Sequence, residues 1–228
     1  MTTTNKARQW PLRLAVLLLF GVAACSTKPS PFAATSSASR QEANAAYHVL
    51  VAQVQQDPAQ ENLSELRDIY LKTDRYTPNA EVESAKTDEL FEAMGNQAWT
   101  DCIAVASAML DQNYTSLYGH FGSMACQRHE GNTELASFHE TVLNDLLEVL
   151  WATGDGASPE SAFHTISTPE LQAFVQLQGL ETITQALKEE HGHWFEVVTV
   201  RNPKTDKEFK LYFDIGGQWS FLATGDSD

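Results

Sequence analysis

Two cysteines in the middle of the chain are spaced so that they could form a disulfide. Cys102 and Cys126 flank Asn113-Tyr114, which we interpret as the turn of a helical hairpin. Residues that face each other across such a turn have numbers that sum to about 228, and 102 and 126 satisfy this relation. Facing Cα atoms can be bridged when they lie within about 7 Å. The spacing predicts a structural disulfide, with two buried free thiols as the alternative.

Four polar residues of the C-terminal third are candidates for a ligand site: Asp155, His193, Tyr212 and Asp214. Asp155 lies between two glycines in a loop that could carry calcium, but Ala157 interrupts the alternating oxygen ligands that calcium loops supply. A turn stabilised by the Asp155 side chain is the alternative. His191 and His193 could bind a metal, but no third ligand is evident. We favour instead an exposed turn position for His191 and packing of His193 under the edge of the sheet. We expect no metal and no cofactor.

Catalytic and nucleotide-binding motifs are not found in the chain. It contains no G-x-S-x-G, no Walker pattern, no G-x-G-x-x-G and no H-E-x-x-H. The 30 acidic residues outnumber the 15 basic ones, and this balance argues against a nucleic-acid partner. These features favour a binding module over an enzyme, without deciding the question.

The first 24 residues have the pattern of a targeting segment. Lys6, Arg8 and Arg13 precede the apolar run Leu14 to Phe20, which is too short to span a bilayer. Val22-Ala23-Ala24-Cys25 then resembles a bacterial lipobox. This resemblance implies cleavage before Cys25, palmitate-type acylation of that residue, and anchoring of the chain to a membrane. A cleaved signal peptide with an incidental cysteine, or a signal anchor, is the alternative.

The mature chain would be strongly acidic and loosely tethered. Removal of three basic residues leaves 12 against 30 acidic ones, a formal net charge of −18. Residues 25–41 are rich in Ser, Ala, Pro and Thr and predict a flexible tether after the lipidated cysteine. Ser26, and not Asp, follows Cys25. We therefore expect an outer-membrane lipoprotein that faces the periplasm of a Gram-negative cell.

Residues 42–153 predict a helical half. Apolar spacing and breakers predict helices over 42–56, 62–70, 89–95, 97–112, 115–129 and 133–151. We expect Asn62 and Thr115 to cap two of these helices, and residues 76–86 to form a loop. Gly119 and Gly122 lie inside a predicted helix, which indicates close approach of a neighbouring helix. The hairpins could stack as tetratricopeptide-like repeats or form a plain bundle.

Residues 154–222 predict a second, α+β half, and residues 223–228 a tail. Alternation predicts strands over 163–167, 180–188, 193–201 and 207–215, and Thr168 is expected to cap a helix that ends near Gln178. The last two strands should form a hairpin around residues 202–206. The predicted fold is α+β: a helical-hairpin half packed on a small antiparallel β-meander, the two halves together forming one domain.

Several segments resemble a bacterial domain family of unknown function that is found in lipoproteins and secreted proteins. They are Gly154 to Phe163 with Ile166-Ser167-Thr168, then Gly192-His193-Trp194, Tyr212-Phe213-Asp214-Ile215, and Leu66 to Tyr70 upstream. The resemblance covers residues 45–220 and implies a cell-envelope location. It implies no activity and no catalytic residue. We expect an adaptor that binds an envelope protein; the alternative is a small ligand-binding protein or enzyme whose site lies where the Gly154–Thr168 loop meets the sheet.

Overall fold

A computed structural model describes residues 37–78 and 81–218. The predicted signal peptide, the lipidation site at Cys25, most of the tether and the predicted tail lie outside these residues. The helices are α1 (Ser37–Gln56), α2 (Gln60–Tyr70), α3 (Glu81–Gly95), α4 (Trp99–Gln112), α5 (Leu117–His129), α6 (Thr133–Trp151), the 3-10 turn η1 (Pro159–Ser161) and α7 (Thr168–Leu177). The strands are β1 (Phe163–His164), β2 (Glu181–Glu190), β3 (His193–Asn202) and β4 (Lys207–Asp214). These elements confirm the predicted α+β class.

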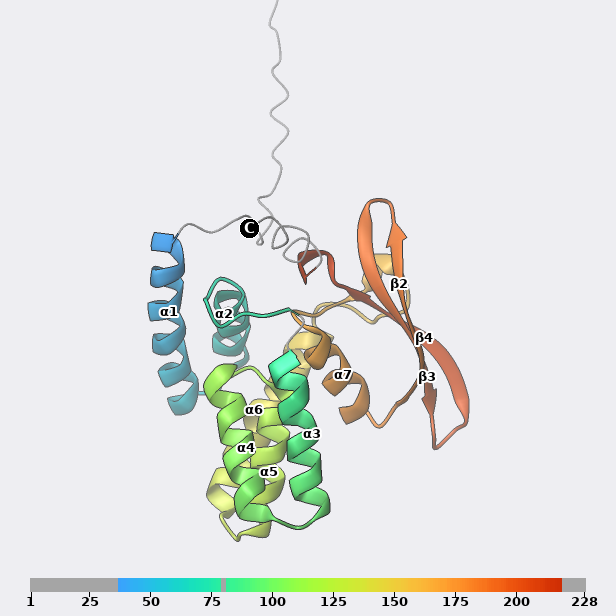
Figure 1. The fold of residues 1–228 in the computed structure, drawn as a ribbon. Helices are drawn as coiled ribbons and strands as arrows, with labels where there is room; N and C mark the ends of the chain where they lie inside the picture. The colour runs from blue at the N-terminus through green and yellow to red at the C-terminus, as the bar shows by residue number, and fades with distance from the viewer. Residues whose placement is uncertain (1–36, 79–80, 219–228) are drawn as a thin grey trace, which may run out of the picture.

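The helical half is a bundle with one helix standing apart. Helices α3, α4, α5 and α6 each pack on the next. Helix α2 packs chiefly on α1, and it also packs on α6. The first hairpin therefore returns to the last helix of the bundle, which is not the linear stacking of tetratricopeptide repeats. Helix α1 and the sheet lie on opposite sides of the bundle (Figure 1).

Close helix packing explains the two glycines of α5. A Cβ atom at Gly119 would lie 2.8 Å from Cδ2 of Leu110 on α4, and one at Gly122 would lie 2.6 Å from Cδ1 of Leu90 on α3. Leu90 is fully buried. Both glycines thus allow α5 to approach its two neighbours, as their positions predicted.

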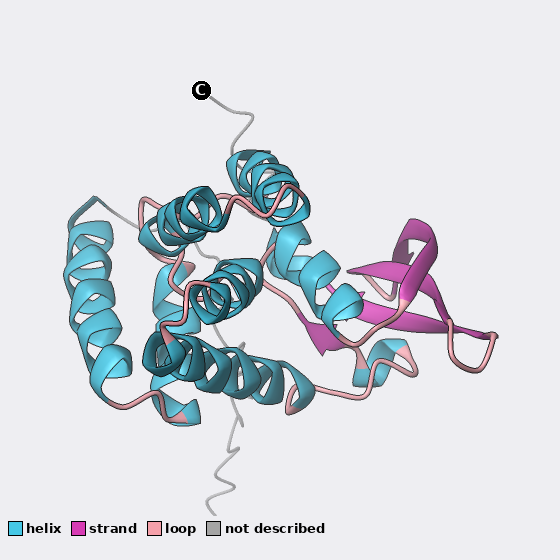
Figure 2. Ribbon diagram, turned by 90° about the horizontal axis from the view of Figure 1, so that it is seen from below, coloured by secondary structure: helices cyan, strands magenta, loops and turns pink. Residues whose placement is uncertain are grey.

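The sheet has the order β1-β4-β3-β2, and it lies to one side of the helices (Figure 2). Strands β2, β3 and β4 form the predicted antiparallel meander, while β1 pairs parallel with β4. The sheet is therefore mixed. Val198 and Val200 of β3 share one face with Phe213 of β4, and all three are fully buried.

Several predicted details are wrong. Helix α2 begins at Gln60, and the Asn62 side chain donates to the Asp57 carbonyl instead of capping. Ser116, and not Thr115, caps α5 through a hydrogen bond from the Gly119 N–H. The predicted loop over residues 76–86 ends early because α3 begins at Glu81.

The predicted first strand of the C-terminal half is shorter than expected. It comprises only Phe163 and His164, because the chain turns at Ser167 into α7. The Ser167 hydroxyl accepts from the Glu170 N–H, so Ser167 and not Thr168 is the N-cap.

Candidate functional site

The predicted site at the loop–sheet junction is occupied by structural contacts. The Asp155 carboxylate accepts hydrogen bonds from the Ala157 N–H at 2.9 Å and the Ser161 hydroxyl at 2.6 Å. These bonds lower the pKa of Asp155, with the Ser161 hydroxyl contributing most. The N–H groups of Asp155 and Gly156 both donate to the Ser161 carbonyl. Asp155 therefore closes the turn, the role that the sequence offered as the alternative to a ligand site.

The other three predicted site residues lie in the sheet: His193 in β3, and Tyr212 and Asp214 in β4. The Tyr212 N–H donates to the Gly156 carbonyl, and Asp214 accepts from the Gly216 N–H. His193 is exposed at the start of β3, so the expectation that it packs under the edge of the sheet is wrong. Among the described residues, no side-chain hydrogen bond joins Asp155 to any of these three.

Aromatic side chains fill the space behind this junction. Phe163, Phe174 and Phe213 are buried, with ring centroids between 4.9 and 6.2 Å apart, and Trp151 packs edge-on against Phe163. A Cβ atom at Gly156 would lie 2.4 Å from the Phe163 ring. Aromatic core thus fills the space directly behind the loop. A hollow of about 210 Å³ lies beside this core, between α7 and the sheet, and none of the four predicted ligand residues lines it.

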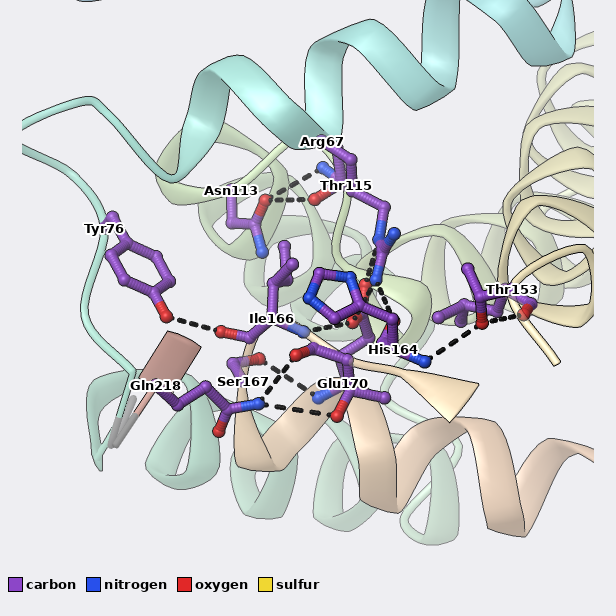
Figure 3. Close-up of polar contacts among 12 residues, drawn as sticks. Arg67, Tyr76, Asn113, Thr115, Thr153, His164, Ile166, Ser167, Glu170 and Gln218 are labelled. Atoms are coloured by element: carbon purple, nitrogen blue, oxygen red, sulfur yellow. Dashed lines mark hydrogen bonds and ion pairs between the residues drawn. The ribbon is translucent and has the colours of Figure 1, made fainter. Parts of the chain in front are cut away.

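A buried ion pair connects the helical half to the C-terminal half (Figure 3). Nε of Arg67 on α2 donates to Oε1 of Glu170 on α7 at 2.8 Å, and Nη2 donates to Oε2 at 2.9 Å. Nη2 also donates to the His164 carbonyl, and Oε2 accepts from the Ile166 N–H. Both charges are therefore fully engaged in holding the β1–α7 segment against α2, which gives this pair a structural role.

A larger hollow lies in the helical half. A groove of about 890 Å³ separates α1 from α4, α5 and α6, and residues of all four helices line it. Its apolar walls include Val51 of α1, Ile103 and Leu110 of α4, and Leu135 and Phe138 of α6. None of the four predicted ligand residues lines this groove. Its size is within the usual range for ligand pockets in proteins.

A pair of histidines lies at the groove. His120 of α5 is fully buried, and His139 of α6 is half-buried and lines the groove. Their Nδ1 atoms are 3.0 Å apart, and Nε2 of His120 lies 2.8 Å from the Tyr114 carbonyl oxygen. Burial lowers the pKa of His120 to about 3, against the hydrogen bond to Tyr114. Burial also lowers the pKa of His139. Both imidazoles are therefore neutral at neutral pH.

A disulfide ties the two helices behind the groove. Cys102 of α4 and Cys126 of α5 are bonded in the structure, with Cα atoms 6.2 Å apart. This is the pairing that the hairpin relation predicted. Ile103 lies next to one cysteine and Gln127 next to the other, and both line the groove. The bond therefore fixes the spacing of the wall that faces α1.

The described residues also bear on metal ligands and membrane spans. Within the described ranges, no cluster of three or more His, Cys, Asp or Glu residues is arranged to hold a metal ion. His191 has a φ of 53° and forms the β2–β3 turn with Gly192. In residues 37–78 and 81–218, no helix combines the length and apolarity needed to cross a bilayer.

Comparison with known families gives one result. The family model described as "Domain of unknown function (DUF4919)" matches residues 35–219. The chain belongs to the DUF4919 family. This confirms the predicted relation to a domain family of unknown function, and the DUF4919 match spans both the helical bundle and the sheet. No curated protein and no solved structure matches the chain.

Sequence reasoning missed the groove and its histidines. His120 and His139 lie on the two helices of the α5–α6 hairpin, and their numbers sum to 259. A turn centred on residue 131 gives 262, so the relation that paired the cysteines would have placed the two histidines within one helical turn of each other. The Arg67–Glu170 pair carried no such indication because the two residues are 103 positions apart.

Proposed function

We propose that this DUF4919 protein is an outer-membrane lipoprotein that binds a segment of another envelope protein in the groove between α1 and the α4–α6 wall. The lipobox-like Val22 to Cys25 and the following tether support the anchored location. The strongly acidic mature chain would be repelled by anionic lipid headgroups, so a lipid on Cys25 would hold it at the membrane.

The position of the groove is the observation that most directly supports a binding function. A ligand-binding protein or enzyme with its site at the loop–sheet junction needs a cavity lined by the predicted ligand residues. The hollow of about 210 Å³ between α7 and the sheet is smaller than the groove, and none of the four predicted ligand residues lines it. The groove lies instead on the helical half, and Leu135 at its edge is 50% exposed. An apolar groove between helices that continues onto the surface suits an extended or helical protein segment.

Blocking the groove tests this function. Ser107 of α4 is exposed and lines the groove, so Ser107→Trp would place an indole in the hollow without disturbing buried atoms. Ser64→Trp on the exposed face of α2 is the matched control. After chemical cross-linking in cells, we expect the wild type and Ser64→Trp to retain the same partner and Ser107→Trp to lose it. Equal recovery from all three proteins would overturn the groove as the binding surface.

The anchored location has a separate test. We expect Cys25→Ala, and globomycin treatment of the wild type, to block processing of the precursor. Normal processing in both cases would refute the lipoprotein part of the proposal and leave the groove unaffected.

A further inference from the structure

Hydrogen-bond donors and acceptors at the histidine pair fix which ring nitrogens carry protons. A carbonyl oxygen only accepts, so Nε2 of His120 must carry the proton that is donated to Tyr114 at 2.8 Å. A neutral imidazole has one N–H, so Nδ1 of His120 is an acceptor. Nδ1 of His139, 3.0 Å away, must then be the donor.

The same logic leaves a lone pair on Nε2 of His139. Within residues 37–78 and 81–218, the one side-chain atom sealed from solvent without a hydrogen bond is Oε2 of Glu190. No described group hydrogen-bonds to Nε2 of His139, so this atom is open to solvent, and its side chain lines the groove. Because Nδ1 of His139 faces His120 inside the bundle, we infer that the opposite edge of the ring offers Nε2 to the groove as a hydrogen-bond acceptor.

The charges of the lining favour a cationic donor. Asp111 and Glu134 contribute two carboxylates, and Arg75 contributes one guanidinium. Nη1 of that guanidinium already donates to the Asp111 carbonyl. A lone imidazole nitrogen suits the single-point donor of an ammonium, whereas the planar fork of arginine matches paired acceptors. An anionic group would meet both the carboxylates and the lone pair.

We propose that the segment bound in the groove contributes a lysine whose ammonium donates a hydrogen bond to Nε2 of His139, with a neighbouring apolar side chain packed against Leu135 and Phe138. This inference rests on the proposed function and specifies the chemistry of the partner. The lowered pKa of His139 keeps the ring neutral, which preserves the acceptor and avoids repulsion between two cations.

Nitrogen NMR of the full mature chain tests the tautomer directly. We expect long-range proton–nitrogen spectra to show the proton of His120 on Nε2 and that of His139 on Nδ1. A proton on Nε2 of His139 at neutral pH would overturn the inference.

Three small probes with the same six-carbon chain test the ligand class. We expect n-hexylammonium to shift the Nε2 resonance of His139 saturably and to bind about tenfold more tightly than hexan-1-ol, because charge-assisted hydrogen bonds are stronger. Hexanoate should bind most weakly. Equal affinities for hexanoate and hexylammonium would overturn the proposal.

Two histidine variants distinguish the loss of the acceptor atom from a general effect of replacing a histidine. His139→Asn keeps a donor near the position of Nδ1 and removes the atom at Nε2, so it should abolish the preference for hexylammonium. His191→Asn, at an exposed turn with positive φ that asparagine tolerates, should retain it. If the groove-dependent partner is captured equally by wild type and His139→Asn, the lysine inference fails and the proposed function stands. If Ser107→Trp leaves capture unchanged, the proposed function itself fails.

Discussion

The Arg67–Glu170 pair allows the sharpest prediction about stability. Glu170→Gln keeps the size of the side chain but removes its charge, which leaves the Arg67 guanidinium buried without a counterion. The two side chains are 5% and 6% exposed, so water cannot replace the lost partner. Removing one member of such a pair costs about 3–5 kcal/mol. For a chain of this length that corresponds to a fall in Tm of roughly 6–20 °C.

The chain offers a control with the same chemistry at the surface. Arg128 and Glu140 form an ion pair at 2.9 Å, but their side chains are 51% and 47% exposed. Glu140→Gln should therefore change the free energy of unfolding by less than about 1 kcal/mol. Both variants are compared by urea denaturation followed by circular dichroism.

The double variant Arg67→Met/Glu170→Gln tests whether the unpaired cation causes the loss of stability. It removes the unpaired cation, so its loss of stability should be smaller than the sum of the two single losses. We also expect one cooperative transition, because the pair joins α2 to α7 and the halves should unfold together. Equal effects of Glu170→Gln and Glu140→Gln, or a fully additive double variant, would refute the account of this pair.

Three further predictions concern buried groups of the helical half. The pKa of His120 is about 3 in the folded chain and 6.5 as an ordinary value, so unfolding takes up a proton below pH 6.5. The free energy of unfolding should therefore fall by about 1.4 kcal/mol per pH unit between pH 6 and pH 4, a slope that His120→Gln should flatten in urea titrations. Replacing Cys102 and Cys126 together by alanine should lower that free energy by about 3 kcal/mol, because the bond closes a loop of 24 positions. Gly122→Ala should cost about 1–3 kcal/mol in the same assay, because its Cβ would lie 2.6 Å from the buried Leu90.

Each of these three predictions can be refuted by a specific result. An unchanged pH slope in His120→Gln would mean that the buried imidazole does not govern acid stability. Equal alkylation of both cysteines without reductant would exclude the disulfide. Gly95→Ala, where no atom lies within 4 Å of the new Cβ, should be nearly neutral, and a similar loss at both glycines would show that packing is not the cause.

Local chemistry explains which elements could be predicted. Helix α6 has the predicted bounds because Gly131-Asn132 stops α5 and no breaker interrupts residues 133–151. The start of α3 was missed because Glu81 to Lys86 is polar, and the buried residues of this helix, Leu90 and Ala93, come later. Strand β1 has two residues and exists only through pairing with β4, about 50 positions later.

The groove depends on tertiary structure and could not be predicted from the sequence. It exists because α1 packs on α2 and not on the α4–α6 wall, a spacing that no local pattern encodes. The predicted junction site was attractive because Gly154, Asp155 and Gly156 form a loop that was expected to meet the sheet near His193. In three dimensions, the same glycines make room for the Phe163 ring and a closed turn.

Site-specific photo-cross-linking in living cells tests the central claim most directly. A photoreactive phenylalanine analogue would replace Leu135, which is 50% exposed at the groove, or Val82 on α3, which is 66% exposed and does not line it. The account predicts a reproducible envelope-protein adduct from position 135 and none from position 82. Adducts of equal yield from both positions, or none from position 135, would contradict binding in the groove.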